Sequence, residues 1–124
     1  MAVVCGEQRL TYEELNRRAN RLAHYLRGLG VVPEMKVGVY LERGLDWMTA
    51  VLGVWKAGGV YVPLDLAYPR ERLAFTVEDA EIEILLTEES LVEEVPGGRA
   101  RVICVDAEWE AIEQQDEEIG RAHV

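Results

Sequence analysis

The chain has 124 residues, of which 49% are apolar and 29% charged, which is enough for one modest core and too little for two domains. The net charge of −10 is uneven: residues 1–105 carry 16 acidic and 12 basic side chains (−4), residues 106–118 carry seven acidic and no basic ones (−7), and Arg121 returns +1. The basic run Arg17, Arg18 and Arg21 lies among acidic neighbours, which argues against nucleic-acid binding.

The first third of the chain predicts a β-hairpin followed by a long helix. Ala2–Cys5 is a short apolar run, and Gly6-Glu7 fits a tight turn into Gln8–Leu10. Thr11, with Glu14 three residues later, has the capping-box pattern that begins a helix, and we expect this helix to span Tyr12–Leu29. Its core-facing stripe is Leu15, Ala19, Leu22, Ala23, Leu26 and Leu29. Gly28 and Gly30 are expected to end the helix with positive φ angles, before Pro33.

The rest of the chain alternates strands and helices. We expect strands at Lys36–Leu41, Val60–Val62, Ile82–Leu86 and Arg101–Val105, and helices from Asp46 to Gly58-Gly59 and at Arg70–Glu78, Glu88–Glu94 and Ala107–Gln114, the last capped by Asp106. Leu73 and Val77 should face inward, and Pro96-Gly97-Gly98 should form a turn. Alternating apolar strands and helices with short loops indicate a parallel α/β sheet.

The helix that contains WMTAVLGVWK (residues 47–56) is apolar nearly all round. A helix of this kind must be covered on several sides. We expect its two tryptophans, together with Tyr61 and Tyr68, to be core residues rather than parts of a cofactor site.

No catalytic or phosphate-binding motif is visible. Gly28-Leu29-Gly30 lacks the third glycine of a dinucleotide fingerprint, and no G-x-x-x-x-G-K-[ST] loop occurs. The paired glutamates are adjacent residues that point apart on a helix. Ser90 and His24 are the only serine or histidine in a useful context, and His24 should be solvent-exposed because it lies off the apolar stripe. We therefore assign no catalytic, cofactor-binding or metal-binding residue.

Cysteine usage and the chain's apolar runs suggest a cytoplasmic, membrane-free protein. The first residues have no basic or long apolar region of a signal peptide, and no apolar run approaches the ~18 residues of a membrane span. Cys5 and Cys104 are expected to be reduced core thiols, and His24 and His123 do not add close ligands for a metal.

The segment WKAGGVYVPLD (residues 55–65) resists a purely structural interpretation. Two glycines lead from a buried helix into a strand, and Pro63 ends that strand. Asp65 would then lie near the carboxyl end of the sheet, where α/β enzymes build their sites. Spacing alone favours a turn-capping role for Asp65 over a functional one.

Two long motifs resemble the adenylation domains of nonribosomal peptide synthetases, within the adenylate-forming (AMP-binding) superfamily. LTYEELNRRANRLAHYLRGLGV (residues 10–31) looks like their first core motif and following helix, and VWKAGGVYVPLDLAYPRERLAFTVEDA (residues 54–80) resembles their second core motif. The likeness extends from Ala2 to about Glu113. Trp55, Val60 and Leu66 depart from the family's usual Leu, Ala and Pro, which affects packing or turns rather than chemistry.

The resemblance implies part of a ligase that activates an amino acid with ATP and Mg²⁺ and passes the aminoacyl group to a carrier-protein phosphopantetheine thiol. Neighbouring condensation and carrier domains, and the remainder of the adenylation domain, would be its partners. The family's phosphate loop, selectivity pocket and catalytic lysine come later in its sequences and have no counterpart here. Asp65, Lys56 and the glycines are therefore expected to be structural, and the chain alone to be inactive and to bind no cofactor.

The resemblance also predicts the domain boundaries. We expect residues 1–118 to form an incomplete, Rossmann-like amino-terminal part of an adenylation domain. IGRAHV (residues 119–124) departs from the family pattern, and we expect it to be a non-native tail.

Two alternatives stay open from sequence. One is an acyl-CoA or aryl-acid synthetase of the same superfamily, and the other is a non-catalytic α/β interaction module. The amino acid activated, the final product, the module position and the oligomeric state are not encoded in these motifs.

Overall fold

The computed structural model describes residues 2–5, 8–96, 98 and 100–114, with side chains described from residue 11 onward. Its elements are β1 (Ala2–Cys5), β2 (Gln8–Thr11), α1 (Tyr12–Gly28), β3 (Lys36–Val39), α2 (Leu45–Lys56), β4 (Val60–Pro63), α3 (Arg70–Asp79), β5 (Ile84–Thr87), the 3₁₀ helix η1 (Glu89–Glu94), β6 (Arg101–Cys104) and α4 (Trp109–Glu113). The predicted tail, residues 119–124, and Gly97 of the predicted turn lie outside the described residues.

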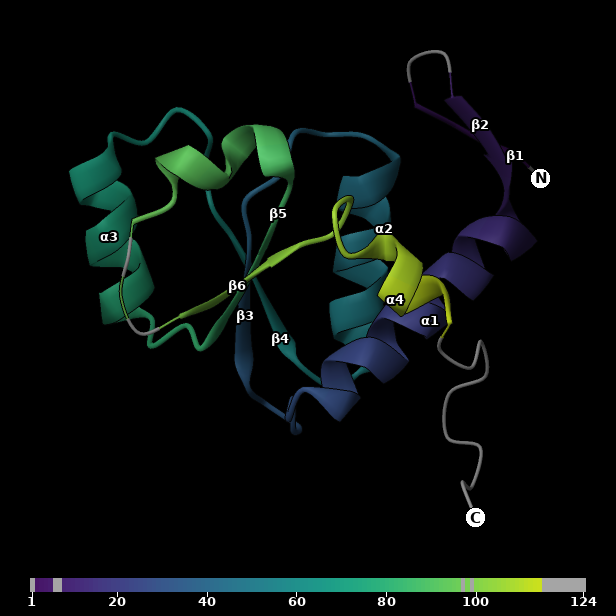
Figure 1. Ribbon diagram of the computed structural model, residues 1–124, viewed down its shortest axis with the longest axis horizontal. Helices are drawn as coiled ribbons and strands as arrows, with labels where there is room; N and C mark the ends of the chain where they lie inside the picture. Colours follow the sequence, from purple (N-terminus) through teal and green to yellow (C-terminus); the bar gives the residue numbers. More distant parts are fainter. Residues whose placement is uncertain (1, 6–7, 97, 99, 115–124) are drawn as a thin grey trace.

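The four strands β3 to β6 form a parallel sheet in the order β4-β3-β5-β6, and β1 pairs with β2 in a separate antiparallel hairpin. Figure 1 shows the sheet between two layers, with α3 and η1 on one side and α1, α2 and α4 on the other. The predicted α/β class, parallel sheet and preceding hairpin are confirmed.

Successive side chains of a strand point to opposite faces of the sheet, so alternate residues pack against the two helix layers. Val37 and Val39 of β3 belong to the core beneath α1, α2 and α4, whereas Tyr40 belongs to the core beneath α3. Ile84 and Leu85 of β5 divide in the same way. Both faces of the sheet are apolar because both are covered.

Helix α1 begins as the capping box predicts. The Thr11 hydroxyl accepts a hydrogen bond from the Glu14 backbone N–H at 3.1 Å, and the Thr11 N–H donates to Glu14 Oε1 at 3.1 Å. That backbone N–H also holds the pKa of the Glu14 carboxyl below its usual value. The predicted stripe is buried from Leu15 to Leu26.

Helix α2 packs on α1 through a glycine. A Cβ atom at Gly53 would lie 2.8 Å from Leu22 Cδ2, so only glycine permits this separation of the two helices without rearrangement. One face of α2, including Ala50 and Val54, is fully buried. The opposite face is not: Trp55 is 72% exposed, and the prediction that Trp55 is a core residue is wrong because no described element covers that side.

Several predicted boundaries also differ from the structure. Gly28 is the last residue of α1, and of the two glycines expected to have a positive φ only Gly30 does, at 107°. Helix α2 begins at Leu45 with Gly44 as its N-cap, so Asp46 lies in its first turn. Helix α4 begins at Trp109 because the Asp106 carboxylate accepts hydrogen bonds from Ala107 N–H (2.8 Å) and Glu89 N–H (3.0 Å), which fix a turn ahead of the helix.

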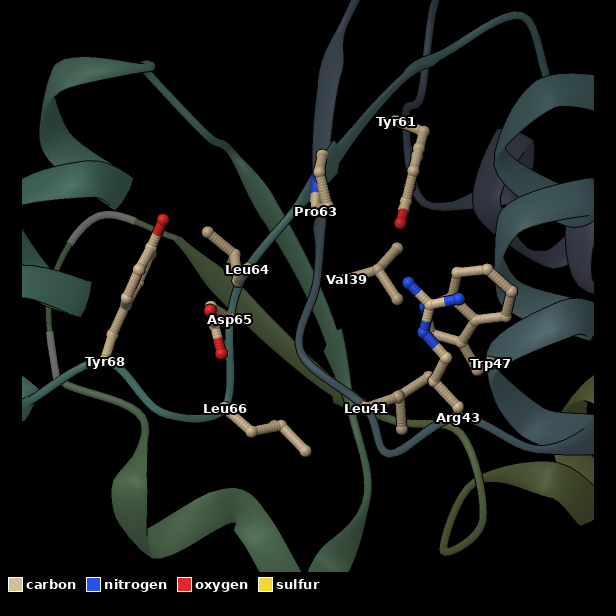
Figure 2. Close-up of a pocket in the computed structure, with 10 residues that line it drawn as sticks. All are labelled: Val39, Leu41, Arg43, Trp47, Tyr61, Pro63, Leu64, Asp65, Leu66 and Tyr68. Carbon is tan, nitrogen blue, oxygen red and sulfur yellow. The ribbon is translucent and has the colours of Figure 1, made fainter.

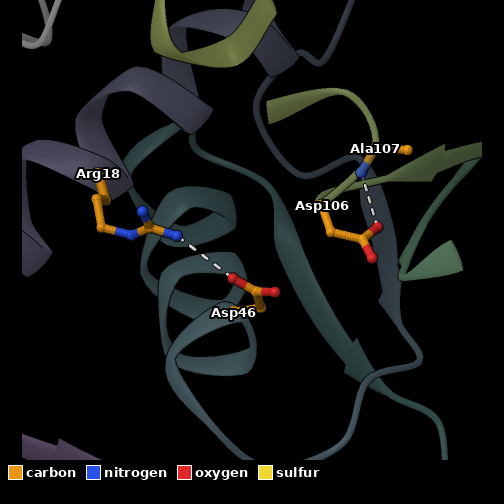
Figure 3. A network of polar contacts seen from close by, with 4 residues as sticks. All are labelled: Arg18, Asp46, Asp106 and Ala107. Carbon is orange, nitrogen blue, oxygen red and sulfur yellow. Dashed lines mark hydrogen bonds and ion pairs between the residues drawn. The ribbon is translucent and has the colours of Figure 1, made fainter. Parts of the chain in front are cut away.

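Two polar side chains of α1 join it to neighbouring elements. The Arg18 guanidinium is 3.3 Å from Asp46 of α2 and stacks 4.1 Å from the centre of the Trp109 ring of α4. The Tyr25 hydroxyl donates to Glu108 Oε1 at 2.8 Å. Arg18 is therefore engaged within the fold (Figure 3) rather than presented to a polyanion.

Candidate functional site

A hollow of about 450 Å³ lies at the carboxyl ends of β3 and β4, the edge of a parallel sheet where α/β proteins usually build sites. Its volume is in the range of small-molecule pockets. The residues lining it are Val39, Leu41, Arg43, Trp47, Tyr61, Pro63, Leu64, Asp65, Leu66 and Tyr68 (Figure 2).

One wall of the hollow is aromatic and cationic. The Arg43 guanidinium lies 4.7 Å from the centre of the Trp47 ring, and Trp47 meets Tyr61 of β4 edge-to-face at 6.5 Å between ring centres. Figure 2 shows these three side chains grouped on one side of β4. No described carboxylate forms an ion pair with Arg43, so its N–H groups remain available to an anion or a carbonyl oxygen.

The other wall contains Asp65 and Tyr68, which a turn holds in place. Asp65 Oδ1 accepts a hydrogen bond from the Ala67 N–H at 2.8 Å, and the Asp65 carbonyl accepts from the Tyr68 N–H at 3.1 Å. Arg72 of α3 stacks 4.7 Å from the Tyr68 ring centre. Asp65 thus caps the turn after β4, the role that spacing alone favoured.

The glycines and Lys56 also have structural positions. Gly58 has φ = 88°, in the left-handed region that side chains rarely adopt. A Cβ atom at Gly59 would be 3.2 Å from the Met35 carbonyl oxygen. Lys56 is the last residue of α2. Together these residues make the sharp connection from α2 to β4.

The sheet has a topological switch point between β3 and β5, because the chain leaves these neighbouring strands toward opposite edges. At this end of the sheet the Thr87 hydroxyl donates a 2.8 Å hydrogen bond to the Tyr40 carbonyl. Burial of the Glu88 carboxyl raises its pKa, and the negative charges of Glu42, Asp106 and Asp46 raise it further. No cation of the described residues forms an ion pair with Glu88, so the neighbouring carboxylates make this end of the sheet acidic.

Nucleophilic and acid–base groups are sparse in the described residues. The hollow has no Ser, Cys, His or Lys in its lining. Burial raises the pKa of the Cys104 thiol, which disfavours the reactive thiolate. Cys104 is half-buried, His24 is half-buried rather than exposed, and Ser90 is exposed. The side chain of Cys5 lies outside the described residues.

No motif singled out Arg43, which follows β3 by four residues. The sequence feature that could have identified Arg43 is its position after a buried strand, because loops at the carboxyl ends of parallel strands often form binding sites. The sequence also did not reveal that Trp47 and Tyr61 would meet, because the pairing depends on the order of the strands.

The AMP-binding enzyme family model matches residues 1–123. The chain belongs to this family. Its relatives include the linear gramicidin synthase subunits D and B of Brevibacillus parabrevis, 49% identical over 118 residues and 50% identical over 116 residues. These matches cover 95% and 94% of this chain but 2% of each relative.

Solved structures agree with this assignment. A structure of the nonribosomal peptide synthetase FmoA3 (S1046A), bound to α-methyl-L-serine-AMP, matches with a TM-score of 0.86 and 39% identity, over 95% of this chain and 13% of that chain. The N-terminal subdomain of Klebsiella oxytoca NpsA matches with a TM-score of 0.81 and 22% identity, over 99% of this chain and 31% of that one; this second likeness concerns the fold alone. The resemblance to adenylation domains predicted from the two motifs is confirmed.

The described residues contain neither a metal-ligand cluster nor a membrane-spanning helix. Among the described residues, no group of three His, Cys, Asp or Glu side chains is placed to hold a metal ion. No helix in the same part of the chain is long and apolar enough to cross a membrane.

Proposed function

We propose that this chain is the amino-terminal scaffold lobe of an adenylation domain that activates an amino acid with ATP and Mg²⁺ for nonribosomal peptide synthesis. The observation that carries the proposal is the 39–50% identity to the nonribosomal peptide synthetase FmoA3 and to two linear gramicidin synthase subunits over nearly the whole chain, together with the TM-score of 0.86 to FmoA3. Aminoacyl transfer to a phosphopantetheine thiol on a carrier domain would follow, with condensation and carrier domains as partners.

The lobe's contribution is structural on this proposal. Catalysis of phosphoryl and adenylyl transfer depends on donors and cations aimed at the phosphates. Here carboxylates surround Glu88 near the switch point of the sheet, and Asp65 caps a turn. ATP, Mg²⁺ and the selectivity pocket are therefore assigned to polypeptide that lies outside this lobe.

The amino-acid branch is favoured over an acyl-CoA or aryl-acid synthetase. NpsA, of which one structure holds 3-hydroxybenzoyl-AMSN, is 22% identical to this chain, whereas FmoA3 is 39% identical. The non-catalytic interaction module predicts instead a lobe that is complete by itself, with no large exposed apolar side chain at an unpacked helix face. Trp55 is such a side chain.

The test is a chimera in which residues 12–113 of this chain replace the matched segment of FmoA3. ATP–pyrophosphate exchange is measured with α-methyl-L-serine for the chimera and for the isolated chain. We expect amino-acid-dependent exchange from the chimera and none from the isolated chain. Exchange by the isolated chain, or none by a chimera whose circular dichroism and unfolding match those of FmoA3, would contradict the proposal.

A further inference from the structure

We draw no further inference here: the strongest candidate, the hollow at the carboxyl ends of β3 and β4 where the Arg43 guanidinium stacks on Trp47, belongs to the site already described, and its lining does not distinguish one ligand chemistry from another.

Discussion

Gly53 of α2 lies directly against Leu22 of α1. A Cβ atom at position 53 would be 2.8 Å from Leu22 Cδ2 and 3.1 Å from Leu22 Cβ, and Leu22 is fully buried. The two helices thus approach each other where the fully buried Leu22 side chain fills the space that a side chain at position 53 would need.

Gly53→Ala is therefore expected to destabilise the fold although alanine is the better helix former. Overpacking in a core costs about 1–3 kcal/mol, which exceeds the gain in helix propensity of about 1 kcal/mol at most positions. Urea unfolding followed by circular dichroism measures the difference. Gly28→Ala is the matched control: nothing lies within 4 Å of a Cβ atom there, and we expect a gain of about 0.5–1 kcal/mol. Equal effects of the two substitutions would show that α1 and α2 are not packed this closely.

Thr11→Ala is expected to destabilise the chain by about 1 kcal/mol, because it removes the side-chain half of the capping box of α1. Thr11→Ser retains the hydroxyl and should lose much less. The free energy of unfolding of the three proteins distinguishes the cap from a general effect of substitution at this site. A serine variant as unstable as the alanine variant would indicate that the methyl group, and not the hydrogen bond, matters here.

Arg18→Ala tests the junction of α1, α2 and α4. The guanidinium pairs with Asp46 at 3.3 Å and stacks on Trp109 at 4.1 Å, and its side chain is 27% exposed. Because the substitution removes both the stacking and a partly exposed ion pair, we expect the free energy of unfolding to fall by about 1–2 kcal/mol. Arg17→Ala, at an exposed position of the same helix, is the control and should change stability little. Arg18→Lys should recover only part of the loss, since a lysine lacks the planar group that stacks on the ring.

Glu88 gives a pH-dependent prediction. Its folded-state pKa is raised, mainly by burial, from the ordinary value of 4.5. The folded state therefore holds more protons than the unfolded state, and the free energy of unfolding falls as the pH rises from 4.5 through the raised value. Glu88→Gln removes this loss, so at neutral pH the variant should be more stable by a few tenths to about 1 kcal/mol.

The measurement is the difference in unfolding free energy between the variant and the unsubstituted chain, from pH 4 to pH 8. The difference should shrink as the pH falls toward and below 4.5, where Glu88 is protonated in both states. A constant difference across the range would assign the effect to hydrogen bonding instead of titration.

Local sequence patterns were sufficient to predict most of the helices and strands. The capping box and the stripe from Leu15 to Leu26 specify α1, because each signal involves residues within one or two turns of each other. Buried apolar runs bounded by glycine or proline likewise predicted four parallel strands and the connection through Gly58. The fold class and the family therefore followed from the sequence alone.

Contacts between distant segments could not be obtained in this way. The order β4-β3-β5-β6 brings Glu42, Asp46 and Asp106 near Glu88 and brings Trp47 against Tyr61. Asp106 also binds the Glu89 N–H across 17 residues of sequence, which is why it does not cap α4. Each of these contacts depends on which strands become neighbours.

The apolar sequence of α2 also shows what the sequence determines and what the tertiary structure decides. Its sequence established that the helix is apolar on more than one side, because that property belongs to the residues themselves. Only the tertiary structure decided which side is covered: α1 and the sheet bury Ala50, Gly53 and Val54, while Trp55 remains in solvent. Periodicity determines that a face is apolar, and the placement of distant elements determines whether that face is buried.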